Sequence, residues 1–288
     1  MANPALSEKR FKEVREEDAG WASPAAAAGL DTAAATGPGG SGPGNTAASG
    51  GVAVPRPGTK LMTANGTFAK TFFLFLFVLA GGAFGWSQVT PAPGNVQNFQ
   101  QVDFPGWIWI AAIAAFLVAL VCIFRPKASP IAGPIYAVLE GVFLGAISAL
   151  FELNWNGIVF QAILATAATF FVTLALYVFG IVKVTRRMQM IVIGATLGIV
   201  VMYLMALMLS LFGVDVTFLN DSSPLSIGIS VLVCGIAAFN LFLDYEFIRQ
   251  ATAAGSPKYM EWYGAFGIML TLVWLYLEFL RLFAKLRS

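Results

Sequence analysis

Residues 260–283 read MEWYGAFGIMLTLVWLYLEFLRLF, and residues 225–248 read LSIGISVLVCGIAAFNLFLDYEFI. Each stretch is long and apolar enough to cross a bilayer as a helix. Asp244 lies near the end of the earlier stretch, and Glu278 lies near the end of the later one. An ionised carboxylate inside a bilayer costs about 3 kcal/mol on insertion scales, so such a residue is a functional hypothesis by default. The first hypothesis is that two adjacent helices bring these acids together to share a proton or a cation.

The composition extends this pattern to most of the chain. Of the 288 residues, 58% are hydrophobic and 11% are charged, whereas about 25% are charged in a soluble domain. Seven apolar spans are predicted, and all should be helices because lipid offers backbone groups no other partner. The spans cover about 68–87, 106–124, 134–151, 157–181, 190–213, 225–248 and 260–283. The fold class is therefore an all-α integral membrane protein, with a seven-transmembrane-helix bundle in residues 59–288.

Residues 1–58 have a different composition. After a charged segment at 7–18, Ala, Gly, Pro, Ser and Thr dominate up to residue 58. Such a stretch cannot bury enough apolar surface to offset the entropy lost on ordering. We predict a disordered N-terminal tail, and a solvated tether is favoured over a partner-binding segment.

Lys and Arg residues in the connectors predict the orientation. They lie before the first span and after the second, fourth and sixth, whereas the connectors 88–105, 152–156 and 214–224 contain none. The positive-inside rule then places the N-terminus in the cytoplasm, in a cell (plasma or inner) membrane. Seven crossings would put Arg281, Lys285 and Arg287 outside, against that rule. Either the upstream bias dominates, or the last span crosses only in part.

Polar side chains recur at helical spacing in the last two spans. Asn240 and Asp244 are four residues apart and share a helix face. In the last span the same 3–4 spacing links Thr271, Trp274, Glu278 and Arg281. One interpretation is a buried polar seam that joins the two helices. The alternative is that Asp244 reaches interfacial water and Glu278 pairs with Arg281, and the spacing leaves both open.

Two more residues are candidates for an ion pathway. Glu140 lies about two turns into the third span, at a depth comparable to that of Asp244, although a structural role is the simpler explanation. Arg125 ends the second span as a candidate counter-ion or as a surface anchor. Glu278 lies about 27 Å beyond Met260 along a straight helix, so a direct contact with Asp244 needs a last helix that begins below the membrane or crosses in part.

Small residues predict how the helices pack. Three glycine pairs have the small-xxx-small spacing that allows helices to approach closely, namely Gly81 and Gly85, Gly141 and Gly145, and Gly194 and Gly198. Cys122 and Cys234 lie inside apolar spans and are expected to be packing residues rather than a disulfide.

Several functional classes are disfavoured by what the sequence contains. With no histidine in the chain, proton sensing would have to come from carboxylates. There is no Gly-x-x-x-x-Gly-Lys-Ser/Thr phosphate loop, and no Gly-x-Gly-Asp motif surrounds either acid. We therefore expect no enzymatic activity, no catalytic residue, no cofactor and no nucleic-acid partner.

The chain also resembles a known family. Residues 275–283 read LYLEFLRLF, where the family commonly has Leu-Tyr-Leu-Asp-Phe followed by a short apolar run. The segments GPIY at 133–136 and EGVFLG at 140–145 are similar to an actinobacterial-type branch. From about residue 60 to residue 288, the chain resembles the Bax inhibitor-1/YccA family, also called the transmembrane BAX inhibitor motif family.

This resemblance implies a helical bundle with the last helix at its centre, and a proton-sensitive calcium leak gated by a pair of aspartates. Carried over by motif, that pair is Asp244 and Glu278, and Arg125 matches the basic end of the second helix loosely. The chain departs from the pattern because Glu replaces the second Asp, because the stretch between the two acids is longer, and because the N-terminal tail is additional.

Two hypotheses for the function follow. The first is a pH-sensitive calcium (cation) leak channel, in which Ca²⁺ transiently contacts Asp244 and Glu278. Its ion pathway or proton sensor would comprise Asp244, Glu278, Glu140, Asn240 and Arg125. The alternative is a non-conducting membrane regulator that binds and modulates another membrane protein, such as a quality-control protease. The lipid bilayer is a partner in both cases, and ion flux in liposomes separates the two.

Overall fold

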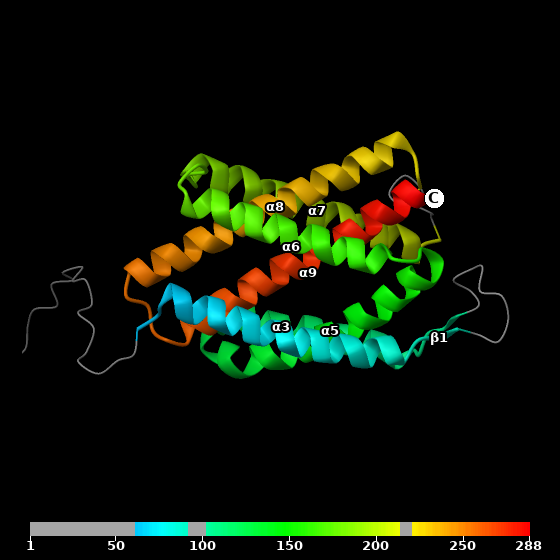
Figure 1. Cartoon of the computed structure of the whole chain (residues 1–288), viewed down its shortest axis with the longest axis horizontal. Coiled ribbons are helices and arrows are strands. Elements are labelled where there is room, and N and C mark those ends of the chain that lie inside the picture. The colour runs from blue at the N-terminus through cyan, green and yellow to red at the C-terminus, as the bar shows by residue number, and fades with distance from the viewer. Residues whose placement is uncertain (1–60, 92–101, 214–220) are drawn as a thin grey trace, which may run out of the picture. The chain divides into compact units, whose positions relative to one another are not determined.

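The computed structural model describes residues 61–91, 102–213 and 221–288, all of which belong to the unit Pro55–Ser288. Within these ranges, seven helices are long and apolar enough to cross a membrane, and Figure 1 shows how the helices are arranged. They are α3 (Ala64–Ser87), α4 (Trp107–Phe124), α5 (Ser129–Asn154), α6 (Ile158–Val178), α7 (Arg186–Leu211), α8 (Pro224–Ala253) and α9 (Met260–Arg287). The predicted all-helical membrane fold is therefore confirmed. The predicted disordered tail at 1–58 lies outside the described residues.

Five helices extend beyond the ends predicted from hydropathy. α3, α5, α7, α8 and α9 each gain polar or charged residues at one or both ends. At the start of α7, the Thr185 side chain accepts a hydrogen bond from the Met188 backbone N–H, and Ser223 caps α8 in the same way. Capping and helix propensity extend a helix into polar residues that a count of apolar residues leaves out. Hydropathy therefore underestimates the length of these helices.

Two short elements lie in the connectors. A 3₁₀ turn, η4 (Pro126–Ala128), links α4 to α5. Between α3 and α4, β1 (Thr90–Pro91) pairs antiparallel with β2 (Val102–Asp103). This two-stranded ribbon was not predicted, because strands of two residues carry no hydrophobic pattern to detect.

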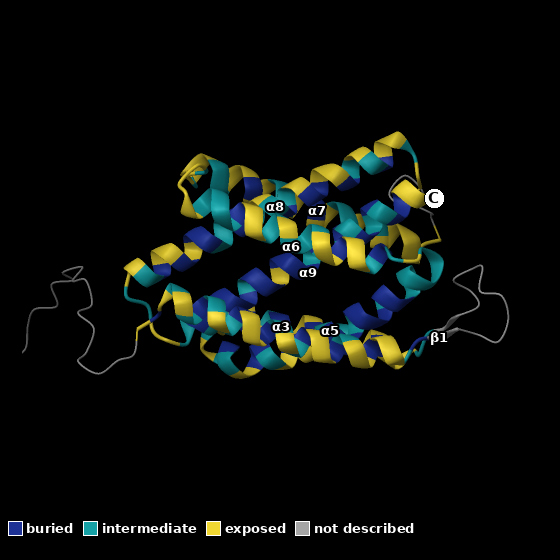
Figure 2. Cartoon of the chain, in the orientation of Figure 1, coloured by how far each residue is buried: buried dark blue, intermediate teal, exposed yellow. Residues whose placement is uncertain are grey.

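The last helix lies at the centre of the bundle. α9 packs against α3, α5, α6 and α8, and Figure 2 shows how much of it is buried. Half of its most apolar window is buried, compared with 11% of that of α7. α9 begins beside the Leu61–Pro257 bridge. At its other end, Arg287 donates to the Asn156 carbonyl oxygen (2.8 Å) in the α5–α6 connector. α9 therefore runs the whole length of the bundle.

Glycines bring α3 and α5 together. A Cβ atom built at Gly85 would overlap the Val142 backbone, and one built at Gly145 would overlap the Gly82 backbone. Gly81 and Gly141 meet the facing backbone in the same way. The predicted close packing is confirmed for these two pairs. The Gly194–Gly198 pair of α7 behaves differently, because no described atom lies within 4 Å of a Cβ built at either position.

Candidate functional site

A seam of polar side chains runs between α7, α8 and α9. At one level, Thr271 of α9 donates a hydrogen bond to Asp244 Oδ2 of α8 (2.7 Å). One turn away on α8, Asn240 Nδ2 donates to Thr196 Oγ1 of α7 (2.8 Å) and to the Ile236 carbonyl oxygen (2.9 Å). These contacts tie three helices together through hydroxyl, amide and carboxylate groups. The seam predicted between the last two helices is present, and it also includes α7.

Further along α9, Glu278 is the centre of a second group of contacts. Its carboxylate is 2% exposed and accepts hydrogen bonds from the Tyr203 hydroxyl of α7 (3.0 and 3.2 Å) and from Trp274 Nε1 (3.2 Å). Arg281 forms an ion pair with it (3.3 Å) and also donates to the Tyr203 oxygen (2.7 Å). Glu278 is therefore held by its own helix and by α7.

Asp244 and Glu278 occupy separate levels of the seam. Among the described contacts they share no hydrogen bond, and each has its own set of partners. Thr271, the partner of Asp244, and Glu278 are seven residues apart on one face of α9, which corresponds to about 10 Å along the helix. The structure therefore does not bring the two acids into direct contact. The Glu278–Arg281 pair, which the sequence offered as an alternative to the seam, is present within it.

The other two candidate pathway residues lie away from the seam. Glu140 of α5 is half-buried and makes no hydrogen bond or ion pair with any described residue. It follows Tyr136 by one turn, and the Tyr136 ring packs against Phe266 of α9. Arg125 is exposed just after α4 and pairs with no acid in the described part of the chain. The contacts thus give Arg125 no counter-ion role toward Asp244 or Glu278.

The basic residues at the C-terminus are held by contacts in the bundle. Lys285 is 7% exposed, and its Nζ donates to Ser230 Oγ (2.8 Å) and to the Ser226 carbonyl oxygen (3.4 Å) of α8. Arg287 reaches Gln161 Oε1 of α6 (2.9 Å). Arg281 is paired as well, so all three basic residues donate hydrogen bonds to oxygen atoms of the bundle or of the α5–α6 connector. These contacts account for basic residues at the end of a full-length α9 without placing that end at the cytoplasmic surface.

Sequence reasoning missed two buried acids. Glu246 accepts hydrogen bonds from Tyr177 of α6 (2.7 Å), from Arg249 and from Gln250. Glu261, in the first turn of α9, accepts from Thr63 and forms an ion pair with Lys70. The spacing of Glu246, Arg249 and Gln250 along one helix was a signal for the first set of contacts. No local signal marked the second, because its partners are nearly 200 residues earlier.

Asp244 and Glu278 each contribute one carboxylate to the seam, and few other acidic side chains lie near either of them. In the described ranges, no group of three or more Cys, Asp and Glu side chains is placed to hold a metal ion. Ca²⁺ prefers six to eight oxygen ligands, which is more than the single carboxylate at either level of the seam supplies.

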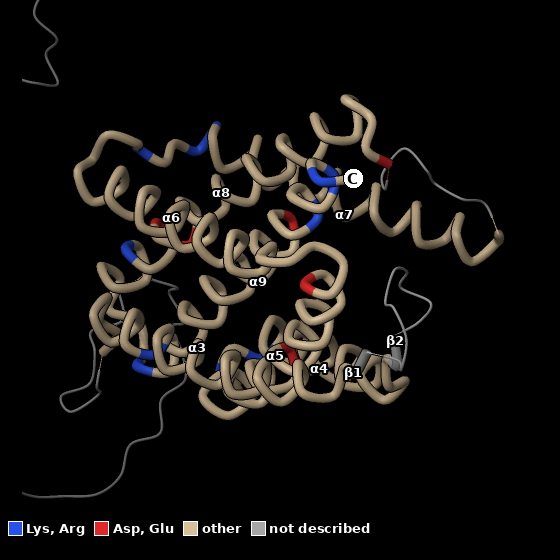
Figure 3. The backbone as a smooth tube through the Cα atoms, turned by 45° about the vertical axis from the view of Figure 1, so that its right-hand side comes forward, with Lys and Arg blue, Asp and Glu red and all other residues tan. Residues whose placement is uncertain are grey.

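Charges are sparse along the helices (Figure 3). The fold and the site together define a multi-pass membrane protein in which a central last helix carries a polar seam shared with α7 and α8. A family model described as Bax inhibitor 1 like matches residues 3–288, and the chain belongs to this family. No curated protein and no solved structure matches the chain.

Proposed function

We propose that the protein is a non-enzymatic, passive leak for cations, with Ca²⁺ as the ion, and that the seam between α7, α8 and α9 is its route. The observation that carries this proposal is the presence of two carboxylates, Asp244 and Glu278, at successive levels of one seam. Hydroxyl and amide oxygens of Thr271, Thr196 and Asn240 accompany them. Polar groups at membrane depth cost free energy. Those that a membrane protein retains therefore commonly line an ion pathway.

The contacts of Glu278 are those expected when the proposed leak is closed. Arg281 neutralises the carboxylate, and Tyr203 ties it to α7, the helix with the smallest buried share. An outward shift of α7 would break the bond from Tyr203 to Glu278 and the bond from Asn240 to Thr196, and would leave the Glu278 carboxylate oxygens free to meet a cation. With no histidine in the chain, the pH response of the leak rests on these carboxylates. The proposed setting is a cell membrane with the N-terminus in the cytoplasm.

Calcium flux in liposomes across a range of pH tests this proposal. We expect Asp244→Asn and Glu278→Gln each to flatten the pH dependence of flux, because each removes one titrating group from the route. The double variant should combine the two single effects, because the two acids lie at separate levels of the seam and share no partner among the described contacts, and such sites usually act independently. The change from carboxylate to amide keeps the side-chain shape, so a loss of folding is a lesser concern.

Glu246→Gln is the matched control, because Glu246 is also a buried acid of α8 but binds Tyr177 and Arg249 outside the seam. Its pH response should stay close to that of the unmodified protein, and Glu140→Gln should likewise have a smaller effect than either seam variant. A wild-type pH response in both Asp244→Asn and Glu278→Gln would contradict the proposed gate. A protein that passes no Ca²⁺ at any pH would instead favour the non-conducting regulator.

A further inference from the structure

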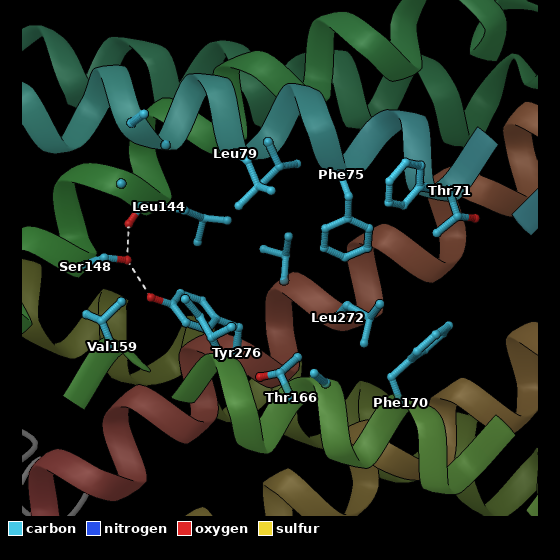
Figure 4. A pocket seen from close by; sticks show the side chains of 18 of the residues that line it. Thr71, Phe75, Leu79, Leu144, Ser148, Val159, Thr166, Phe170, Leu272 and Tyr276 are labelled. Atoms are coloured by element: carbon cyan, nitrogen blue, oxygen red, sulfur yellow. Dashed lines mark hydrogen bonds between the residues drawn. The ribbon is translucent and has the colours of Figure 1, made fainter. Parts of the chain in front are cut away.

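An apolar cavity of about 870 Å³ lies outside the seam, over α9 and between α3 and α6. Figure 4 shows its walls, to which α5 also contributes through Leu144 and Ser148. This volume falls within the range of about 300–1,000 Å³ that is typical of small-molecule sites. The proposed leak does not use this cavity.

The polar groups of the wall already have partners. The Ser148 and Tyr276 hydroxyls bond to each other (2.6 Å), as Figure 4 shows. Thr166 donates to the Ala162 carbonyl oxygen (2.8 Å), and Thr71 donates to that of Thr67 (3.0 Å). No charged side chain is among the described residues that line the cavity. The wall therefore offers nothing to an ion or a polar ligand, and its occupant must be apolar.

The cavity opens toward the lipid. Four of its lining residues, Phe72 and Leu79 of α3 and Ile163 and Phe171 of α6, are also exposed on the outer surface of the bundle. These residues belong to helices that can span a membrane. The surface that they expose at this depth meets acyl chains rather than water. A bilayer lipid therefore reaches the cavity sideways, between α3 and α6.

The cavity is long enough to hold an acyl chain and begins at the membrane interface. Along α3 the lining runs from Phe68 to Trp86, about 27 Å at 1.5 Å per residue, and the hydrocarbon core of a bilayer, which two opposed acyl chains fill, is about 30 Å thick. An acyl chain that enters at one end therefore fits within the cavity. Trp86 belongs to the last turn of α3, where tryptophan commonly marks the membrane interface. Toward the other end, the aromatic residues Phe68 and Phe170 line the cavity.

We propose that this cavity binds one acyl chain of a bilayer phospholipid, with the headgroup at the level of Trp86 and the chain end pointing toward Phe68 and Phe170. The lipid is a resident ligand that fills the space between α3 and α6. This site goes beyond the proposed leak and does not depend on it.

The first test uses native mass spectrometry of the protein extracted from phosphatidylcholine–phosphatidylethanolamine vesicles. Ala83→Leu and Ala167→Phe place bulk inside the cavity, because both alanines line it. Ala80→Leu and Ala168→Phe are the matched controls, since they make the same changes at exposed positions of the same helices outside the lining. We expect the retained lipid to fall about tenfold in the cavity variants, as loss of several buried methylene contacts predicts, and to stay unchanged in the controls. Equal retention in all four variants would mean annular lipid only and would overturn the proposal.

A second test needs no substitution and therefore does not depend on how the variants fold. Phosphatidylcholine with a diazirine at the middle of one acyl chain is photolysed in vesicles with the unmodified protein, and the adducts are mapped by mass spectrometry. We expect adducts to concentrate on the mid-cavity residues Leu79 and Thr166 over Ile110 of α4, which is exposed but outside the lining. Adducts spread in proportion to exposure would overturn the proposal. Calcium flux is not a readout in either test, so failure of the leak leaves the result intact.

Discussion

The two sides of α9 hold their helices together in opposite ways. On one side, α3 and α5 meet through glycines whose backbones touch, without polar side chains at the point of contact. On the other side, Thr196 of α7 accepts a hydrogen bond from Asn240 of α8, and Tyr203 of α7 donates one to Glu278 of α9. Between helices in lipid, apolar burial gives little driving force, so association relies on close packing or on polar contacts. Close packing joins α3 to α5, and polar contacts join the helices along which the proposed route lies.

The difference predicts which half tolerates movement. Backbone contacts across glycines persist only while the distance between the two helices is kept within a few tenths of an ångström. A shift of α3 against α5 would therefore lose most of these contacts together. Hydrogen bonds between side chains can exchange partners when one helix moves. A gate is therefore expected on the α7 side, and the α3–α5 pair is expected to stay fixed during opening.

The largest effect should come from a methyl group placed between α3 and α5. Gly145→Ala puts a Cβ where the Gly82 backbone lies, and neither backbone can give way as a flexible side chain would. Overpacking of this kind costs about 1–3 kcal/mol, and we expect the upper end here. The measurement is thermal or denaturant unfolding in detergent, read as a fall in stability.

Gly133→Ala is the control for that change on the same helix, because a Cβ there meets only Leu74 side-chain atoms at 3.8 and 4.0 Å. It should cost far less than Gly145→Ala. Equal stability of the two variants would show that α3 and α5 do not approach as closely as described.

A smaller effect is expected for the bonds that tie α7 to α9. A double-mutant cycle of Tyr203→Phe and Glu278→Gln isolates the contact at 3.0 and 3.2 Å. Hydrogen bonds between membrane helices average about 0.6 kcal/mol and reach about 1.7, so we expect a coupling free energy of about 1 kcal/mol in unfolding. Additive effects of the two changes would place Tyr203 outside the Glu278 contacts and would remove the proposed tie to α7.

The sequence predicted the fold well because hydropathy is a local signal, and glycine spacing marked the close contact of α3 and α5 in the same way. It offered the seam as one of two interpretations for the same reason, since Asn240 and Asp244, and Thr271 and Glu278, share faces within single helices. It did not predict that Tyr203 and Thr196 complete the seam, because the rotation of α7 depends on tertiary packing. Nor did it indicate that Thr271 would be the partner of Asp244. To predict that contact, one must know how far α8 and α9 are shifted along each other.

The same argument explains why one glycine pair was interpreted wrongly. Gly194 and Gly198 have the spacing of the α3 and α5 pairs, but they lie on the exposed side of α7. Spacing shows that a face is flat, and it does not show that another helix lies against it.

The smallest effect should come from that open face, with the opposite sign. Gly198→Ala adds a methyl group with no described atom within 4 Å, so it meets no steric cost within the chain. Alanine favours a helix interior over glycine by about 0.5–1 kcal/mol because glycine loses more backbone freedom on ordering. We therefore expect a small gain in stability, measured by the same unfolding assay as Gly145→Ala. A clear loss in vesicles that is absent in dilute detergent would contradict an open face, because it would require a second surface pressed against Gly198 in the bilayer.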